Sequence, residues 1–187
     1  TTVAAGRGAG GNALNDTYNA IQDATGGSGN DLFIASAAAN AFDGGLGTNT
    51  VSYTNSAAGV RVNLSDEIVN TIAARSGKDS HADLDSYTNI QNVIGSNSAD
   101  TLIGASSGAT ALTGGAGSDT LIGIAANSAN TYASYAGSTA GVTINLMAGT
   151  GVGGHAQGDT LSNIDNVIGS SFDDKFIGNG KVNIFNG

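Results

Sequence analysis

The sequence predicts an all-β protein built as a parallel β-solenoid, or β-roll, in two tandem units of about 80 residues. Three observations lead to this fold class. Long segments of the chain recur, short apolar runs alternate with glycine-rich turns, and no segment carries the apolar stripe of a sustained amphipathic helix.

The longer repeat organises most of the chain. Three pairs of similar segments carry it: 50–64 with 132–146, 88–104 with 162–178, and 26–34 with 114–122. The pairing predicts an N-terminal lead-in or cap over 1–25, a first unit over 26–113, and a second unit over 114–187 that is truncated at its C-terminal end.

A finer period lies inside each unit. GGSGNDLFI at 26–34 is followed 18 residues later by GGLGTNTVS at 44–52, and GSNSADTLI at 95–103 precedes GGAGSDTLI by 19 residues. Eighteen residues are two nonapeptides, each a turn followed by a short strand. Two turns on the same edge should therefore lie one coil apart, with glycines supplying the positive φ that the turns need.

The expected strands are short and alternate in polarity. Val60, Val62 and Leu64 should lie on one inward face, and Val142, Ile144 and Leu146 repeat this pattern in the second unit. Leu or Phe in the nonapeptides should also point inward. The recurring Tyr53 and Tyr135 fit core or capping positions at strand ends.

The composition excludes several classes of partner and site and favours the binding of a cation. Fifteen acidic against six basic residues give a net charge of −9, which argues against nucleic acid or an anionic membrane surface as a partner. No apolar run is long enough to cross a bilayer, and the absence of cysteine excludes disulfides and thiolate metal sites. Glu67 is the single glutamate, and the abundance of Asp favours turns and oxygen-ligand cation sites.

The nonapeptide GGxGxDxUx, in which U is a large apolar residue, is fitted by GGSGNDLFI and GGAGSDTLI at every defined position. This motif resembles the calcium-binding repeats of the RTX (repeats-in-toxin) proteins, which are secreted bacterial adhesins and surface-layer proteins among others. The resemblance covers about residues 26–187. It implies calcium-binding turns and export by one-step (type I) secretion, with which the absence of an N-terminal signal agrees.

Calcium prefers six to eight oxygen ligands, and one turn offers too few. We therefore expect an ion to lie between two stacked turns, held by backbone carbonyls and by the acidic sixth position. The predicted ligands are Gly27, Gly29, Asp31, Gly45, Gly47, Asn49, Asp100, Gly115, Gly117, Asp119 and Asp174.

The turns depart from the motif in places. Asn49 replaces the expected acid, and the turns 95–100 and 169–174 lack the second and third glycines. The opposing turns 35–40, 104–110 and 178–183 contain no acid. We therefore expect few calcium sites, and along one edge only.

His81 and His155 occupy equivalent places, four residues before Asp85 and Asp159. A zinc pair or catalytic dyad is an alternative, but neither unit supplies a companion nucleophile or second base. The favoured interpretation is that each histidine fixes a loop, and that Asp85 and Asp159 are further calcium ligands.

These features predict a non-catalytic, calcium-binding structural module of a secreted extracellular protein, such as a surface layer, adhesin or fibre. It should either self-associate, head to tail or as a filament, or continue into a longer parent chain. One alternative is the accessory module of a secreted enzyme whose catalytic domain lies elsewhere. Another is an ice- or glycan-binding solenoid, suggested by the outward-facing Thr101 and Thr120.

Overall fold

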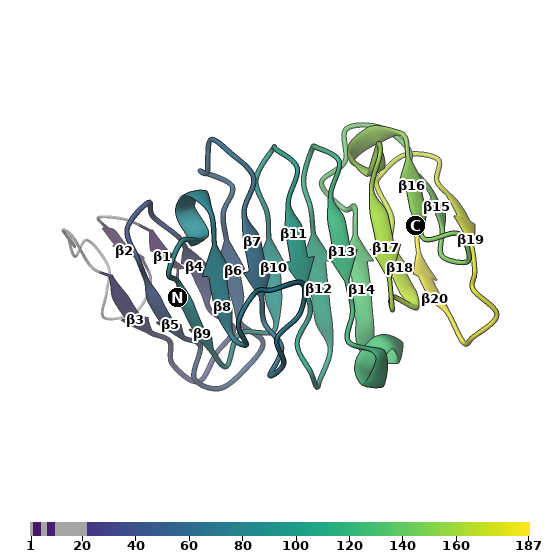
Figure 1. Cartoon of the computed structure of the whole chain (residues 1–187). Helices are drawn as coiled ribbons and strands as arrows, with labels where there is room; N and C mark the ends of the chain where they lie inside the picture. The colour runs from purple at the N-terminus through teal and green to yellow at the C-terminus, as the bar shows by residue number, and fades with distance from the viewer. Residues whose placement is uncertain (1, 5–6, 10–21) are drawn as a thin grey trace.

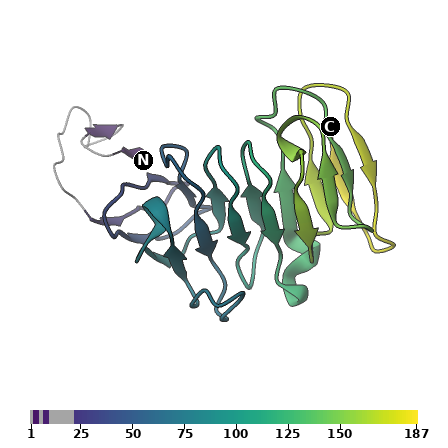
Figure 2. The same cartoon turned by 45° about the horizontal axis from the view of Figure 1, so that its top comes forward.

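The computed structural model describes residues 2–4, 7–9 and 22–187, and it is an all-β structure with two large, mostly parallel sheets (Figures 1 and 2). The described residues contain no α-helix. Their helical segments are three short 3-10 turns: η2 (Ser80–Ala82), η3 (Ala125–Asn130) and η4 (Gly154–Ala156). The prediction of an all-β chain with parallel strands is confirmed.

The first sheet has nine strands. They lie across the long axis of the molecule and follow one another along its length in Figure 1. In spatial order they are β2 (Arg7–Ala9), β1 (Thr2–Ala4), β4 (Leu32–Ile34), β6 (Thr50–Ser52), β10 (Asn92–Ile94), β12 (Thr110–Thr113), β14 (Thr131–Ser134), β18 (Asn166–Ile168) and β20 (Ile184–Asn186). From β1 to β20 every neighbouring pair is parallel, and β2 pairs with β1 in the antiparallel sense.

The second sheet has eleven strands. In spatial order they are β19 (Lys175–Ile177), β15 (Thr143–Asn145), β16 (Thr150–Val152), β17 (Thr160–Ser162), β13 (Thr120–Ile122), β11 (Thr101–Ile103), β7 (Arg61–Asn63), β8 (Ser76–Lys78), β9 (Ser86–Thr88), β5 (Ala41–Asp43) and β3 (Asp23–Thr25). Only β8 and β16 run antiparallel to their neighbours in this sheet.

From β3 onward the chain alternates between the two sheets, except where β7 to β9 and β15 to β17 stay in the eleven-stranded sheet, so consecutive turns fall on opposite edges. We call edge I the side where the chain passes from the nine-stranded to the eleven-stranded sheet, and edge II the side of its return. Leu32 pairs with Thr50, and Thr101 pairs with Thr120. These separations of 18 and 19 residues confirm that turns two nonapeptides apart stack on one edge.

A three-strand meander occurs twice in the eleven-stranded sheet. In the first copy, β7 turns back through antiparallel β8 and η2 to β9, which pairs with the earlier strand β5. In the second copy, β15, β16, η4 and β17 repeat this path, and β17 pairs with β13. The segments that contain His81 and His155 were predicted to be loops, and their antiparallel strands β8 and β16 were not predicted.

The main core lies between the sheets and is formed by the middle residues of the strands. These residues include Phe33, Val51, Val62, Val93, Leu102, Leu112, Leu121, Ala133, Ile144 and Val167, all fully buried. The predicted inward positions Val60, Leu64, Val142 and Leu146 belong to the same cluster. The inward alternation predicted from the sequence is therefore confirmed.

A smaller apolar cluster lies outside this core, where the connection 64–75 packs Ile72 against Ile103 and Ile124. Asn63 holds the connection in place, because its Nδ2 donates to the carbonyls of Glu67, Ile72 and Ala73. The equivalent connection of the second meander, 146–149, is much shorter.

Candidate cation-binding turns

The predicted ligand turns do not share one edge. Turns 26–31 and 44–49 lead from the eleven-stranded to the nine-stranded sheet and lie on edge II. Turns 95–100, 114–119 and 169–174 lie on edge I. The prediction of a single ligand edge is wrong, because the same nonapeptide builds the half-coil on either side and its motif does not specify the edge.

The turns adopt two conformations. In turns 44–49 and 114–119 the second and fourth positions are left-handed, with φ of 71° and 89° at Gly45 and Gly47, and of 98° and 128° at Gly115 and Gly117. These positive φ values require glycine. In turns 26–31, 95–100 and 169–174 the second-position amide instead donates to the Oδ2 of the sixth-position Asp, at 2.8, 2.7 and 2.7 Å respectively.

The sixth-position side chains point inward and join successive coils. Along edge I, the Asp100 amide donates to Asp119 Oδ1 at 2.9 Å, and the Asp119 amide donates to Asp159 Oδ1 at 2.8 Å. Along edge II, the Asp31 amide donates to Asn49 Oδ1 at 2.9 Å. All five side chains are at most 4% exposed. They therefore satisfy buried backbone amides that the short strands leave unpaired.

Two of the predicted ligands already use both carboxylate oxygens. Asp100 accepts the amides of Val60 and Ser96, and Asp174 accepts those of Val142 and Ser170. Burial raises the pKa of Asp100. At the less buried Asp174 the hydrogen bonds outweigh burial and lower the pKa. These carboxylates work as structural acceptors in the turns.

Asp85 and Asp159 also have full sets of partners. Asp85 Oδ1 accepts the Asn40 amide at 2.7 Å, and its Oδ2 accepts the hydroxyl of Tyr53 at 2.6 Å. Tyr135 donates to Asp159 Oδ2 at 2.9 Å in the second copy. Burial raises the pKa of Asp85 to about 6 and raises that of Asp159 as well.

These tyrosine–aspartate pairs were missed in the sequence analysis, although both members recur. Tyr53 and Tyr135 are buried as predicted. His81 and His155 lie in η2 and η4, and among the described residues His81 Nδ1 is a buried nitrogen without a hydrogen-bond partner.

Asp119 differs from the other sixth-position residues. Its Oδ2 is buried, and within the described residues no hydrogen-bond donor reaches this atom. Burial, together with the nearby charges of Asp159 and Asp100, raises the pKa of Asp119 to about 8, against the effect of the Asp100 amide. An unpartnered buried carboxylate oxygen is costly and requires a proton or a cation.

Asn49 occupies the equivalent place in the other turn with left-handed glycines. Its turn has the same left-handed glycines as the Asp119 turn, and its Nδ2 donates to the carbonyls of Leu46 and Asn89. A Cβ added to the first glycine of each turn would lie 2.3 Å from Asn49 Nδ2 and 2.0 Å from Asp119 Oδ2. Asp119 Oδ2 thus occupies the place of an amide donor that faces carbonyl oxygens.

The residues at Asp119 fit a cation, and those at Asp100 and Asp174 do not. The orphan oxygen of Asp119 provides one charged oxygen ligand of the kind that calcium prefers, and the equivalent Asn49 amide faces the carbonyls of Leu46 and Asn89. The described residues contain no group of three or more His, Cys, Asp or Glu side chains that could hold a metal. Any ion at Asp119 therefore depends on carbonyl ligands.

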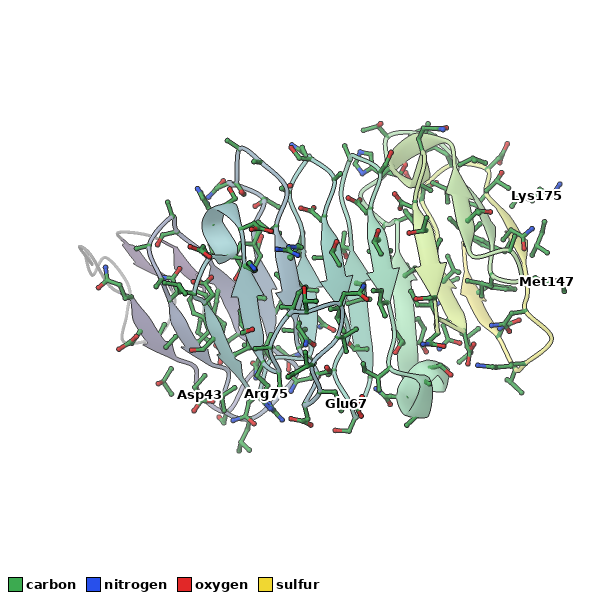
Figure 3. The ribbon with its side chains drawn as sticks, in the orientation of Figure 1. Asp43, Glu67, Arg75, Met147 and Lys175 are labelled. Atoms are coloured by element: carbon green, nitrogen blue, oxygen red, sulfur yellow. The ribbon has the colours of Figure 1, made fainter. Side chains whose placement is uncertain are left out.

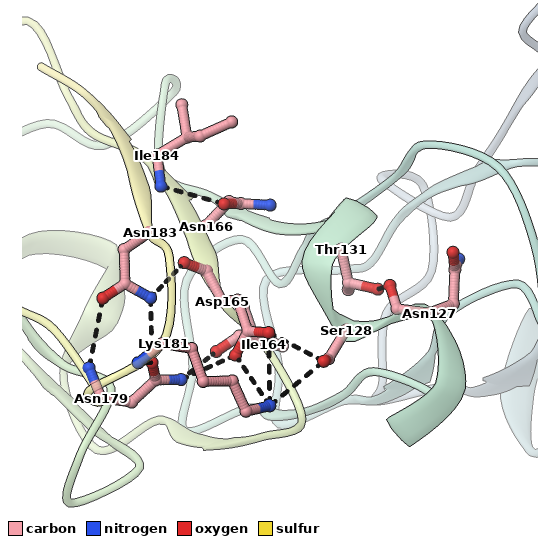
Figure 4. Close-up of polar contacts among 10 residues, drawn as sticks. All are labelled: Asn127, Ser128, Thr131, Ile164, Asp165, Asn166, Asn179, Lys181, Asn183 and Ile184. Carbon is pink, nitrogen blue, oxygen red and sulfur yellow. Dashed lines mark hydrogen bonds and ion pairs between the residues drawn. The ribbon is translucent and has the colours of Figure 1, made fainter.

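A second polar cluster joins the C-terminal coil to η3 (Figure 4). Asp165, 2% exposed, accepts hydrogen bonds from Ser128 Oγ at 2.8 Å and Asn179 Nδ2 at 2.7 Å, and pairs with Lys181 Nζ at 3.3 Å. These three partners outweigh burial and lower the pKa of Asp165. The carboxylate therefore stays charged and pairs with the Lys181 ammonium. Ser128 and Lys181 thus have a structural role, because both bind Asp165 and so connect η3 to the C-terminal turn.

Comparisons with known proteins do not identify the chain: no family model matches it, and no curated protein matches it. In the part of the chain that the structure describes, no helix is long and apolar enough to cross a membrane.

Proposed function

We propose that the chain is a non-catalytic, calcium-binding structural module of a secreted extracellular protein, with an RTX-like β-solenoid made of two tandem units. The observation that carries the proposal is the buried Oδ2 of Asp119, which has no donor in the described residues. In the equivalent turn 44–49, this place beside the first glycine is taken by the amide donor of Asn49. A divalent cation there would remove the cost of the buried charge.

The ligands in this proposal are Asp119 Oδ2 and backbone carbonyls of the turn 114–119. Bound calcium would supply positive charge at a buried carboxylate and so link folding to metal concentration. The residues around the proposed ion have structural roles. Asp119 Oδ1 and Asp159 Oδ1 accept amides of the adjacent coil and so fix its stacking. Gly115 and Gly117 adopt the positive φ values of the tight turn.

A structural role, as opposed to a catalytic one, is supported by how the polar groups are used. The buried carboxylates of Asp85, Asp100 and Asp159 are occupied by backbone amides and hydroxyls. An extracellular setting, a surface-layer or adhesin identity and type I secretion follow from the RTX resemblance, and millimolar extracellular calcium suits a weak site of few charges.

Contact between coil ends is part of the proposal. Val182, Ile184 and Phe185 near β20 are 86%, 46% and 38% exposed, and they are the apolar side chains that a head-to-tail copy would cover. In a longer parent chain, the next coil would cover them instead. Either arrangement buries the row of unpaired backbone groups along β20.

Calcium should raise the thermal stability of the folded chain. The test is a calcium titration followed by circular dichroism melting, with magnesium as the control cation and EGTA to reverse the effect. At a hundredfold excess over the dissociation constant, one site adds about 2.7 kcal/mol, a shift of several degrees. An unchanged melting temperature in millimolar calcium and in EGTA contradicts the proposal.

A further inference from the structure

A cavity of about 350 Å³ lies between the connection 64–75 and the segment 122–126, where β13 leads into η3. Its lining comes from three separate segments of the chain, among them Glu67 and Val69, Ile122 and Ile124, and Asn163. The volume lies near the lower end of the range of about 300–1,000 Å³ that is typical of small-molecule sites. A ligand of this cavity must therefore be short.

The connection that forms one wall of the cavity is an addition to the first unit. In the second meander the much shorter segment 146–149 takes its place, and the same antiparallel pairing forms there. The long connection is therefore not needed to build the coil. It is nevertheless held firmly, because the buried Asn63 side chain donates to three of its carbonyls and Ile72 packs beneath it. This wall of the cavity is thus formed before any ligand binds.

The backbone around the cavity adopts rare conformations. Eight non-glycine residues of the described chain have a positive φ, and four of them belong to the connection or line the cavity: Asn70, Thr71, Arg75 and Asn163. The φ of 65° at Thr71 is especially unusual, because this residue is β-branched. Such conformations persist only where the surrounding structure imposes them, and they concentrate at ligand sites.

The cavity combines an aliphatic wall with a free carboxylate. Val69, Ile122 and Ile124 belong to the outer apolar cluster and form the aliphatic wall. The carboxylate is that of Glu67, which is labelled in Figure 3 and lies at an exposed position of the connection. Within the described residues, the hydrogen bonds of Glu67 involve only its backbone carbonyl and amide. Its side chain is therefore available to a ligand.

We propose that this cavity binds a short aliphatic ammonium group, with the carbon chain on the aliphatic wall and the positive charge at Glu67. Arg75, the cation of the connection, pairs with Asp66 and does not neutralise the Glu67 carboxylate. The net charge of −9 also favours a cationic ligand over an anionic one. A free amine and a lysine side chain of a partner protein present the same chemistry, since both join an ammonium group to a chain of methylenes.

Nuclear magnetic resonance titration of the ¹⁵N-labelled chain with butylammonium tests the inference, in EGTA and again in millimolar calcium. The amides of Val69, Gly123 and Asn163, which line the cavity, should shift with a dissociation constant of about 1 mM, as expected for so small a ligand. Butanol has a similar chain without the charge and should bind more weakly. In a parallel titration with Nα-acetyl-lysine methylamide, matching shifts assign the site to a lysine side chain, and their absence assigns it to a free amine.

Glu67→Gln should weaken the binding of butylammonium about fivefold, because a partly exposed ion pair contributes little more than this. The connection should keep its structure in this variant, since Asn63 and Ser65 hold Glu67 through its backbone carbonyl. Asp173→Asn changes the net charge equally at an exposed position outside the cavity, and this matched control should bind as the wild type does. Val69→Thr makes the aliphatic wall more polar and should weaken butylammonium and butanol alike.

An absence of shifts in the wild type overturns the inference, as does equal affinity of the wild type and Glu67→Gln for butylammonium. Equal affinity of the wild type for butanol and butylammonium also overturns it, because the charge would then play no part. Circular dichroism melting shows that each variant is folded before it is compared. The titration in EGTA keeps this test separate from the proposed calcium site, because Asp119 does not line the cavity.

Discussion

In metal-free buffer, Asp119→Asn should stabilise the protein at alkaline pH. The pKa of Asp119 in the folded state is about 8, well above the 3.8 of an unperturbed Asp, so the folded state binds this proton more tightly than the unfolded state does. The contribution of the protonated carboxyl to the free energy of unfolding is therefore fully present at acid pH and is lost as pH rises through 8. Each pKa unit corresponds to about 1.4 kcal/mol. The wild type should therefore lose several kcal/mol between pH 4 and pH 9, and the variant should lose much less.

The Asn49 turn explains why the fold should accept this substitution. The introduced asparagine would keep the acceptor for the Asp100 amide, and its new NH₂ group could donate to the Ala116 carbonyl, as Asn49 does to Leu46. Asp173→Asn, at an exposed position, is the control for net charge. Chemical denaturation at pH 5, 7 and 9 in EGTA measures the effect. Equal pH profiles for the wild type and Asp119→Asn would show that the Asp119 carboxylate carries no such cost.

Gly141→Ala should destabilise the fold strongly in calcium and in EGTA alike. A Cβ at Gly141 would lie 2.0 Å from the carbonyl oxygen of Asp173, and Gly59 faces Ala99 in the same way at 2.0 Å. The obstructing atoms are backbone of the adjacent coil, so two coils would have to separate. We expect a loss of about 1–3 kcal/mol for either substitution, the range found for overpacked cores.

Gly137→Ala is the matched control, because a Cβ there meets nothing within 4 Å. It should change the free energy of unfolding by less than about 0.5 kcal/mol, as exposed substitutions usually do. Urea denaturation of the three variants provides the comparison. If Gly141→Ala is as stable as Gly137→Ala, the close stacking of coils at this position is wrong.

The short strands and their register could be predicted from the sequence because local pattern dictates them. Alternation put Val62 and Ile144 into the core, and the nonapeptide spacing set the register of Leu32 with Thr50. The sheet to which each strand belongs could not be predicted from the sequence. The segments 26–34 and 114–122 have similar sequences, yet β4 lies in the nine-stranded sheet and β13 in the eleven-stranded sheet. The sequence does not distinguish the two sheets, because the half-coils on both sides have the same length and turn chemistry.

The meanders were missed for a different reason. β8 is only Ser76–Lys78, a polar segment with a central glycine, and it is a strand because β7 and β9 flank it. Its strand character comes from tertiary context, which overrides propensity.

The positions of the candidate side chains in the turns could be predicted, but their hydrogen-bond partners could not. The motif pointed to the acidic sixth position of each turn, and the structure places Asp31, Asp100 and Asp119 inward at these positions. Sequence could not distinguish Asp100, whose oxygens accept amides, from Asp119, whose Oδ2 has no donor in the described residues. In the Asp100 turn the second-position amide of Ser96 donates to the carboxylate, whereas in the Asp119 turn the second position is Gly115 with a left-handed φ of 98°.

Calorimetric calcium titration of the wild type, Asp119→Asn and Asp31→Asn is the most direct test of the central claim. Each protein is first shown to be folded by circular dichroism in EGTA. The account predicts that the wild type and Asp31→Asn bind calcium with similar affinity, and that Asp119→Asn loses this binding while keeping its fold. Calcium binding by Asp119→Asn equal to that of the wild type would contradict the account.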